Sequence, residues 1–129
     1  NTPYEALKYL REKGIKTAVA TATALDITKS HLTTIGVCDL FDSIVSAKNV
    51  AHGKPEPDVY LYACEQIGER PQDCMAVEDS PNGIMAAYRA GLRTVMVPDL
   101  TQPDEELTKY LYACVNSLSD LCELVDKED

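Results

Sequence analysis

Three short apolar runs in this sequence are followed by side chains that could together hold a phosphate and a metal ion. Thr21 ends the first run, Lys54 lies in the loop after the second, and Glu78 and Asp79 follow the third. A threonine hydroxyl can donate a hydrogen bond to one phosphate oxygen, and a lysine ammonium can hold another as a point charge. Two adjacent carboxylates suit Mg²⁺, which takes one or two protein carboxylates and keeps waters and phosphate oxygens as further ligands. These residue types predict phosphoryl transfer, in which a protein mainly positions groups and neutralises charge.

Each of these signals also has an ordinary structural explanation. A threonine after a strand is usually a turn residue, an isolated lysine is usually a solvated surface charge, and acids before a helix complement its dipole. Ser80 and Pro81 are explained as the N-cap and the first position of a helix. The turn from Ser80 to Gly83 also leads into a helix N-terminus, whose N–H groups favour a nearby anion. The functional interpretation therefore depends on these residues meeting in one place.

The elements that must position these residues predict an α/β fold, a three-layer Rossmann-like arrangement with helices on both faces of a parallel sheet. Apolar runs of strand length fall at residues 16–21, 43–46, 74–77 and 94–97, and helical patterns fall at residues 3–13, 25–35, 58–67, 81–90, 105–113 and 117–125. The carboxyl ends of parallel strands meet at one edge of a sheet, where ligands bind. We therefore expect Thr21, Lys54, Glu78 and Asp79 to converge on one cleft at that edge.

Size and composition limit what else the chain can do. Its 129 residues, 45% of them hydrophobic, fit one domain over residues 1–129, without room for a second substrate-binding domain. The net charge of −9 opposes binding to nucleic acid or to an anionic membrane surface. The five cysteines form no CxxC pair, and no apolar run approaches the roughly 18 residues of a membrane helix. We therefore expect a cytoplasmic protein with reduced cysteines, and an excerpt of a longer protein, because the first residue is Asn1 rather than Met.

Three segments, taken in order, resemble motifs of the haloacid dehalogenase superfamily, above all of its β-phosphoglucomutase-like and sugar-phosphate phosphatase members. Residues 15–23 (IKTAVATAT) are similar to the strand that ends in a phosphate-binding Ser or Thr. Residues 53–60 (GKPEPDVY) resemble the GKPxPD motif that supplies a lysine, and residues 76–84 (AVEDSPNGI) resemble the motif that carries metal-binding acids. The two latter matches are long and specific, and the resemblance spans about residues 2–125.

This resemblance implies a Mg²⁺-dependent enzyme that transfers the phosphoryl group of a small phosphorylated metabolite, such as a sugar phosphate, through an aspartyl phosphate. The implied metal ligands are Glu78 and Asp79, and the implied catalytic residues are Thr21 and Lys54. The implied phosphate-binding residues are Thr21, Ala22, Lys54, Ser80 and Asn82.

One motif of the superfamily has no counterpart, because no Asp-x-Asp occurs in these 129 residues. In the family that motif follows a central strand and supplies the nucleophile, and a helical cap follows it. The strand would lie between the strand ending at Thr21 and the strand ending before Asp79. We therefore expect this chain alone to be inactive. We also expect those two strands not to pair directly, with a missing segment or another chain between them.

Two other functions are compatible with part of the pattern. A noncatalytic binding or regulatory module is favoured by the missing nucleophile and disfavoured by the polar residues retained at three strand ends. A response-regulator receiver domain also uses acids, a threonine and a lysine, but there the acidic pair comes first and the lysine last. Here Thr21 precedes Lys54, and Lys54 precedes Glu78 and Asp79, so the receiver domain is set aside.

Overall fold

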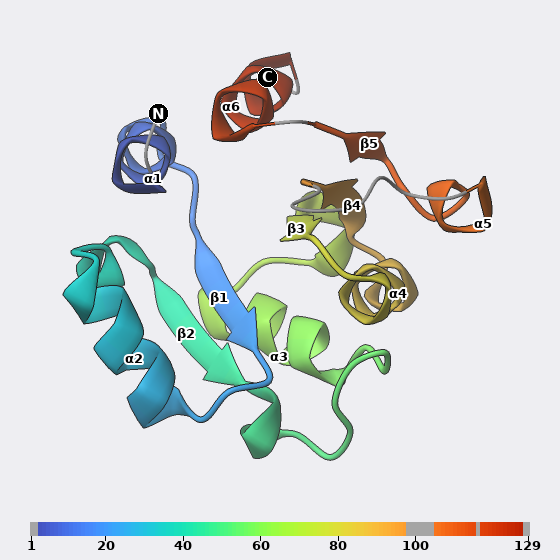
Figure 1. Cartoon of the computed structure of the whole chain (residues 1–129), viewed down its shortest axis with the longest axis horizontal. Helices are drawn as coiled ribbons and strands as arrows, with labels where there is room; N and C mark the ends of the chain where they lie inside the picture. Colours follow the sequence, from blue (N-terminus) through green and yellow to red (C-terminus); the bar gives the residue numbers. More distant parts are fainter. Residues whose placement is uncertain (1–2, 98–104, 116, 128–129) are drawn as a thin grey trace.

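In the computed structural model, which describes residues 3–97, 105–115 and 117–127, the strands form two separate parallel groups (Figure 1). β1 (Ala18–Thr21) pairs with β2 (Ser43–Ser46). β3 (Met75–Glu78) pairs with β4 (Arg93–Met96), and β4 also pairs with β5 (Ala113–Cys114). Among the described residues no ladder joins β1 to β3, which confirms that these two strands do not pair directly.

Helices lie on both sides of the strands, as the sequence predicted. β2 is contacted by α2 (Leu25–Thr34) and by α3 (Asp58–Ile67), which lie on opposite sides of it (Figure 1). α3 also packs against α4 (Pro81–Ala90), which contacts β3 and β4. α1 (Pro3–Glu12) packs against α6 (Leu118–Lys127), so the first and last helices of the chain meet. Short 3₁₀ turns at Cys38–Leu40, Ala47–Asn49 and Pro71–Asp73 complete the connections.

Local sequence signals explain where the helices near the site begin and end. Ser80 is the N-cap of α4: its side chain accepts a hydrogen bond from the Gly83 N–H at 3.2 Å, and Pro81 occupies the first helical position. Gly91 ends this helix with φ of 92°, a left-handed conformation that favours glycine. The pattern Thr2-Pro3-Tyr4-Glu5 predicts a capping box with Thr2 as the N-cap of α1, but Thr2 lies outside the described residues.

One predicted helix is wrong over much of its length. The pattern at residues 105–113 predicted a single helix, whereas α5 (Glu105–Thr108) is short and β5 follows it. The Tyr112 N–H donates to the Thr94 carbonyl at 2.8 Å, and the Val115 N–H donates to the Met96 carbonyl at 2.9 Å. Backbone pairing with the otherwise open edge of β4 therefore overrides the helical pattern here.

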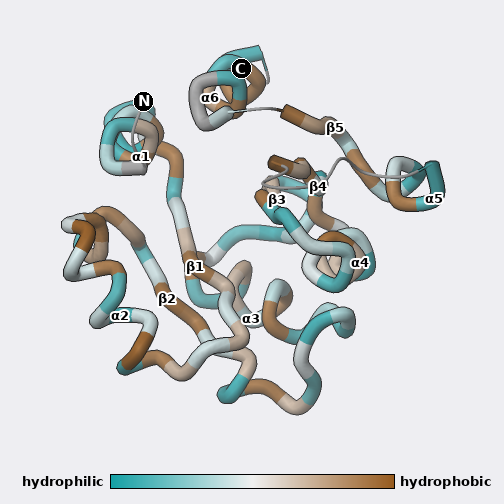
Figure 2. The backbone as a smooth tube through the Cα atoms, in the orientation of Figure 1, coloured by the Kyte–Doolittle hydropathy of each residue, from teal (hydrophilic) through white to brown (hydrophobic). Residues whose placement is uncertain are grey.

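The core lies between α3, α4 and the strands that these helices cover. Val59 of α3 and Ala86 and Ala87 of α4 are fully buried, and they cluster with Val45 of β2 and Ala76 of β3. Figure 2 shows hydrophobic residues along β2 and β4. Within the described residues, no helix combines the length and the apolar character needed to cross a membrane.

Candidate active site

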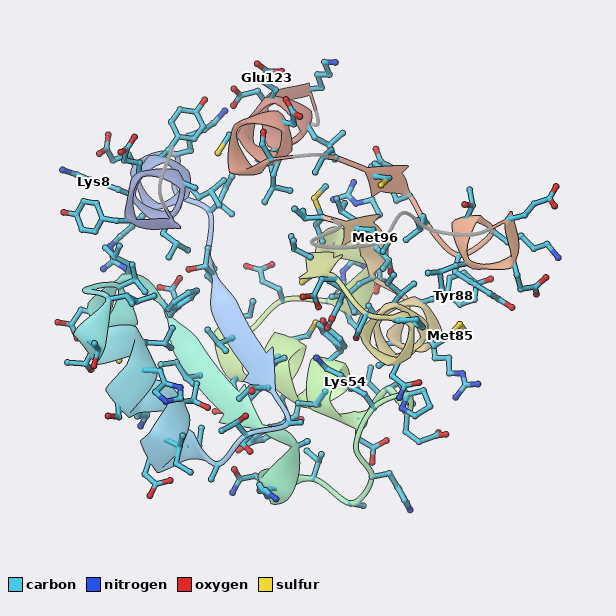
Figure 3. The ribbon with its side chains drawn as sticks, in the orientation of Figure 1. Lys8, Lys54, Met85, Tyr88, Met96 and Glu123 are labelled. Carbon is cyan, nitrogen blue, oxygen red and sulfur yellow. The ribbon has the colours of Figure 1, made fainter. Side chains whose placement is uncertain are left out.

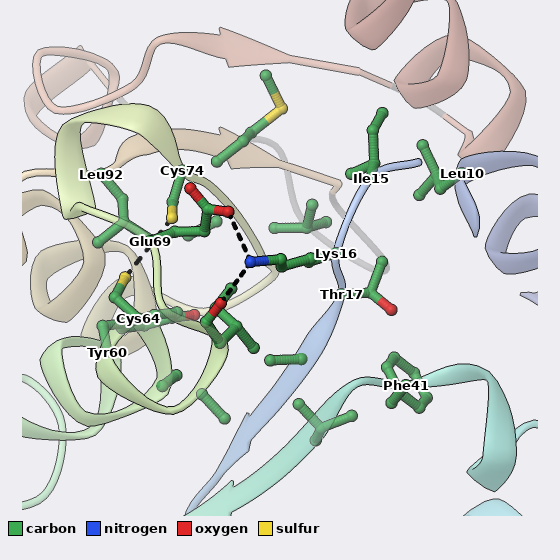
Figure 4. A pocket seen from close by; sticks show the side chains of 18 of the residues that line it. Leu10, Ile15, Lys16, Thr17, Phe41, Tyr60, Cys64, Glu69, Cys74 and Leu92 are labelled. Carbon is green, nitrogen blue, oxygen red and sulfur yellow. Dashed lines mark hydrogen bonds and ion pairs between the residues drawn. The ribbon is translucent and has the colours of Figure 1, made fainter. Parts of the chain in front are cut away.

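A cavity of about 780 Å³ separates the two strand groups, and we call it the slot (Figure 4). One wall is residues 16–20, around β1, and the opposite wall is residues 75–78 of β3. α3 contributes Tyr60, Ala63, Cys64 and Ile67, while α1 and α6 contribute leucines and a valine. The slot therefore lies where a strand joining β1 to β3 would be found.

Lys54 bridges the slot at the end where β1 and β3 terminate. Its Nζ donates to the Ala20 carbonyl at 3.2 Å and to Glu78 Oε2 at 2.7 Å. The Lys54 side chain is 18% exposed and that of Glu78 is 9% exposed, so the ion pair is largely shielded from water. Figure 3 shows Lys54 between the two strand groups. The structure thus joins the lysine of the second loop to the acid of β3, as the sequence led us to expect.

Tyr60 is a site residue that the sequence analysis did not identify. Its hydroxyl donates to Glu78 Oε2, and the Lys54 ammonium lies 5.2 Å from the centre of its ring. Burial, followed by the Glu78 charge and hydrogen bond, raises the pKa of Tyr60, so its hydroxyl stays protonated as a donor. Tyr60 lies within the GKPEPDVY segment, but a tyrosine on a buried helix face gives no sign of a polar partner.

Gly83 forms the other side of the Glu78 carboxylate. A Cβ built at Gly83 would lie 1.9 Å from Glu78 Oε1, far closer than any real contact. The carboxylate therefore lies directly against the backbone of the first turn of α4. Glu78 is thus confined by Lys54 and Tyr60 at one oxygen and by the Gly83 backbone at the other.

The turn after β1 is fixed by side-chain hydrogen bonds. The Thr23 N–H donates to Thr21 Oγ1 at 3.1 Å, and Ser46 Oγ donates to the Thr23 carbonyl at 2.7 Å. Ser46 ends β2 and is fully buried. Thr21 is half-buried at the end of β1, and Ala22 is exposed in the turn. Thr21 lies next to Ala20, whose carbonyl binds Lys54, so this turn borders the Lys54 end of the slot.

The remaining predicted site residues do not take part in the hydrogen bonds among Lys54, Tyr60 and Glu78. Asp79 and Asn82 are exposed, and Asp79 affects the cluster through its charge, which contributes to the raised pKa of Tyr60. Ser80 serves as the α4 cap. Within the described residues, no group of three or more acids, histidines or cysteines is arranged to hold a metal. The functional roles assigned from the sequence stay predictions.

Comparisons with known proteins show the family to which this chain is similar. The profile of a family described as haloacid dehalogenase-like hydrolase matches residues 2–97. Hexitol phosphatase B of Escherichia coli (strain K12) is 33% identical over 124 residues, which cover 96% of this chain and 54% of that protein.

Two crystal structures share the fold. The β-phosphoglucomutase from Clostridium difficile superposes with a TM-score of 0.81 at 26% identity, covering 95% of this chain and 52% of that one. CbbY from Rhodobacter sphaeroides, in complex with phosphate, gives 0.81 at 31% identity, covering 92% and 55%. This chain spans about half the length of the relatives that it matches.

Proposed function

Because this chain belongs to the haloacid dehalogenase-like hydrolase family, we propose that it supplies the phosphate- and metal-binding half of a phosphoryl-transfer domain. The proposed substrate is a small phosphorylated metabolite of the sugar-phosphate type, and the domain is a phosphatase or a phosphomutase. The observation that carries this proposal is the contact between Lys54 and Glu78, which joins the ends of β1 and β3 at one end of the slot. The hexitol phosphatase and the phosphate-bound CbbY are consistent with this substrate class.

The chain's own groups would bind and orient the phosphate. Lys54 would hold a phosphate oxygen as a point charge, and the Thr21 hydroxyl would donate to a second. Ser80 and Asn82 lie at the N-terminus of α4, where backbone N–H groups favour an anion. Ala22, in the turn after Thr21, would bring its backbone N–H to the same phosphate. These groups stabilise charge on the transferring group without reorganising during the reaction.

Glu78 and Asp79 would hold Mg²⁺, and the chemistry of these two residues supports such a role. Two adjacent carboxylates are the number that Mg²⁺ takes from many proteins. Glu78 Oε2 accepts from Lys54 and Tyr60, and Oε1 lies against the Gly83 backbone, whereas Asp79 is exposed. Asp79 is therefore the more accessible of the two carboxylates for a cation. When bound, Mg²⁺ neutralises phosphate charge and orients the phosphate.

The nucleophile must come from outside these 129 residues, since they contain no Asp-x-Asp. We propose that a strand carrying this motif fills the slot, supplied by a further segment of the protein or by another chain. Its first aspartate would attack phosphorus to form an aspartyl phosphate, and its second would act as general acid and base. The chain alone would then bind phosphate without turning it over.

Phosphate binding by the isolated chain tests this proposal directly. We expect inorganic phosphate, titrated with Mg²⁺ and followed by ³¹P NMR, to bind weakly, and Lys54→Ala to weaken the binding about tenfold or more. Lys48→Ala is the matched control, because Lys48 is exposed in the turn after β2 and lacks the Glu78 contact. Equal binding by both variants would remove Lys54 from the site. Hydrolysis of p-nitrophenyl phosphate by the chain alone would contradict the need for a supplied nucleophile.

A noncatalytic binding module is the second candidate, favoured by the absent Asp-x-Asp. The two functions differ once a segment with an apolar strand ending in Asp-x-Asp is added to the chain. A phosphoryl-transfer domain should then gain Mg²⁺-dependent hydrolysis of p-nitrophenyl phosphate. A binding module would take up the segment, seen as increased thermal stability, and remain inactive.

A further inference from the structure

Two cysteines lie side by side on the wall of the slot and have no part in the proposed function. Cys64 Sγ, on α3, is 3.7 Å from Cys74 Sγ, on the residue that precedes β3 (Figure 4). Both residues line the slot, and both are thiols in the structure. Cys64 is buried with 3% exposure, whereas Cys74 is half-buried.

We propose that Cys64 and Cys74 are a redox modification site, which peroxide converts into an intramolecular disulfide across the wall of the slot. The two sulfurs must close from 3.7 Å to about 2.0 Å, a distance that side-chain rotation and small backbone shifts can supply. A small peroxide can reach Cys74 from the slot, and Cys64 is the sulfur in position to complete the bond.

The chemistry balances in two steps. Cys74 loses its proton and its sulfur attacks one oxygen of hydrogen peroxide, so an S–O bond forms, the O–O bond breaks and hydroxide leaves. Cys64 then loses its proton and attacks the Cys74 sulfenic acid, so the S–S bond forms and the S–O bond breaks. Overall, two thiols give up two electrons and two protons, and one peroxide becomes two waters. The second step is intramolecular and gains from proximity.

The surroundings of the pair make the first step slow at neutral pH. Burial raises the pKa of Cys64 to about 12 and is also the largest cause of the raised pKa of Cys74. Around Cys74, the Glu69 and Asp73 charges raise the pKa further, while the Cys64 hydrogen bond and the Arg93 charge lower it. Because the thiolate is the nucleophile, the rate should rise about tenfold per pH unit below these pKa values.

The disulfide would change the slot itself. It closes a ring over residues 64–74, which includes the 3₁₀ turn Pro71–Asp73, and ties the C-terminal half of α3 to the start of β3. That junction borders the slot near Lys16, whose Nζ donates to the Ile67 carbonyl at 2.9 Å and pairs with Glu69 (Figure 4). A strand or other segment bound in the slot would shield Cys74 from peroxide. We therefore expect the disulfide to form only while the slot is open.

Peptide mapping of the whole chain after hydrogen peroxide tests the proposal without any substitution. Remaining thiols are alkylated, and the chain is digested with a protease that cleaves after glutamate, at Glu65 and Glu69 between the two cysteines. We expect the peptides carrying Cys64 and Cys74 to remain linked until a reductant is added, with about tenfold faster linkage at pH 8.5 than at pH 7.5. Cys38, Cys114 and Cys122 should be recovered alkylated.

The competing pair Cys114 and Cys122 supplies an internal control, because these cysteines are closer together in the sequence than Cys64 and Cys74. In urea, where chain separation alone sets the pairing, the link between Cys114 and Cys122 should form at least as readily. Two results would overturn the proposal: the same product distribution with and without urea, or peroxide-treated Cys74 recovered as a sulfinic acid with Cys64 still alkylated. Cys114→Ser should leave the Cys64–Cys74 link unchanged.

Discussion

Residues from three separate elements contact the carboxylate of Glu78. Lys54 comes from the loop after β2, Tyr60 from α3 and Gly83 from α4. Each contact removes freedom from a charged side chain that is 9% exposed. A buried carboxylate needs such partners, because an unpaired charge at this depth would be costly. The same contacts hold Glu78 in one orientation before any ligand arrives.

Replacing Tyr60 with Phe tests the hydroxyl contribution to this orientation. The change removes one of two donors to Glu78 Oε2 and leaves the ring in place. We expect a loss of about 1–2 kcal/mol in the free energy of unfolding, measured with urea. Tyr62→Phe, on the same helix, is the matched control and should change stability little. An unchanged free energy of unfolding for Tyr60→Phe would show that the hydroxyl contact is not formed in solution.

Gly83→Ala tests the close approach of Glu78 to α4. Alanine normally stabilises a helix interior by about 1 kcal/mol relative to glycine, so a simple propensity effect predicts a gain. Here the new methyl group would overlap Glu78 Oε1, and we expect a net loss of about 1–3 kcal/mol instead. Gly53→Ala is the control, because the nearest atom to a Cβ at Gly53 is 3.8 Å away. A stabilised Gly83→Ala variant would place the carboxylate elsewhere.

The charged residues of the site could be predicted from the sequence, but the residues that fix the orientation of Glu78 could not. Lys54 and Glu78 could be predicted because they end strands or follow them in a recognisable order. Tyr60 and Gly83 could not, since a helical tyrosine and a helical glycine acquire their roles only when α3 packs against α4 and both helices meet Glu78. Their contribution is a property of tertiary contact, which leaves no pattern within either helix.

Among the elements, the first and last helices are joined by a cluster at one acid. Tyr9 of α1 donates to both oxygens of Asp126 of α6, at 2.8 and 2.6 Å, and Lys13 forms an ion pair with it. Hydrogen bonds from Lys13 and then Tyr9 lower the pKa of Asp126. Both helices also line the slot, α1 through Leu7 and Leu10 and α6 through Leu121 and Val125. The contact between the two helices therefore holds this part of the slot wall together.

Asp126→Asn should weaken the docking of α6 on α1 at neutral pH. A lowered carboxyl pKa contributes stability that is present above the ordinary value of about 3.9 and is lost as pH falls through the lowered value. The difference in Tm between the wild-type chain and Asp126→Asn should therefore shrink between about pH 6 and about pH 3. Glu123→Gln removes the same charge from an exposed position of α6 and serves as control. A difference in Tm that stays constant over this range would exclude the Asp126 carboxylate as its cause.

Helices and strands were predictable to different degrees. α2, α3 and α4 follow the predicted ranges closely because a glycine marks the end of each helix in the sequence, and Ser80 also marks the start of α4. β5 was missed because two residues of strand carry no periodicity, and the pairing with β4 that creates it lies in another part of the chain. Short edge strands are decided by an available partner rather than by their own residues.

The molecule as a whole presents two open strand edges to one cavity. The Asp42 N–H donates to the Thr17 carbonyl, so Thr17 directs its backbone groups toward β2. The Val97 N–H donates to the Glu78 carbonyl, so Glu78 directs its backbone groups toward β4. Alternate residues of a strand direct theirs to the opposite edge. The slot-facing backbone groups, which we call the open-edge residues, therefore belong to Ala18, Ala20, Met75 and Val77. Among the backbone groups of the open-edge residues, the Ala20 carbonyl accepts a side-chain hydrogen bond, which Lys54 Nζ donates.

Amide hydrogen exchange tests whether a strand belongs in the slot. In the chain alone, the open-edge amides should exchange faster than those of Val19 and Ala76, which point to β2 and β4 within the same strands. Adding a segment with an apolar strand should slow the open-edge amides and leave Val19 and Ala76 nearly unchanged, because only the open edges gain hydrogen-bond partners. Dilution checks the one competing explanation, since edge-to-edge self-association would protect the same amides in a concentration-dependent way. Equal protection of the open-edge amides and of the Val19 and Ala76 amides at every concentration would mean that β1 and β3 already pair with each other. The slot could then not bind a missing strand.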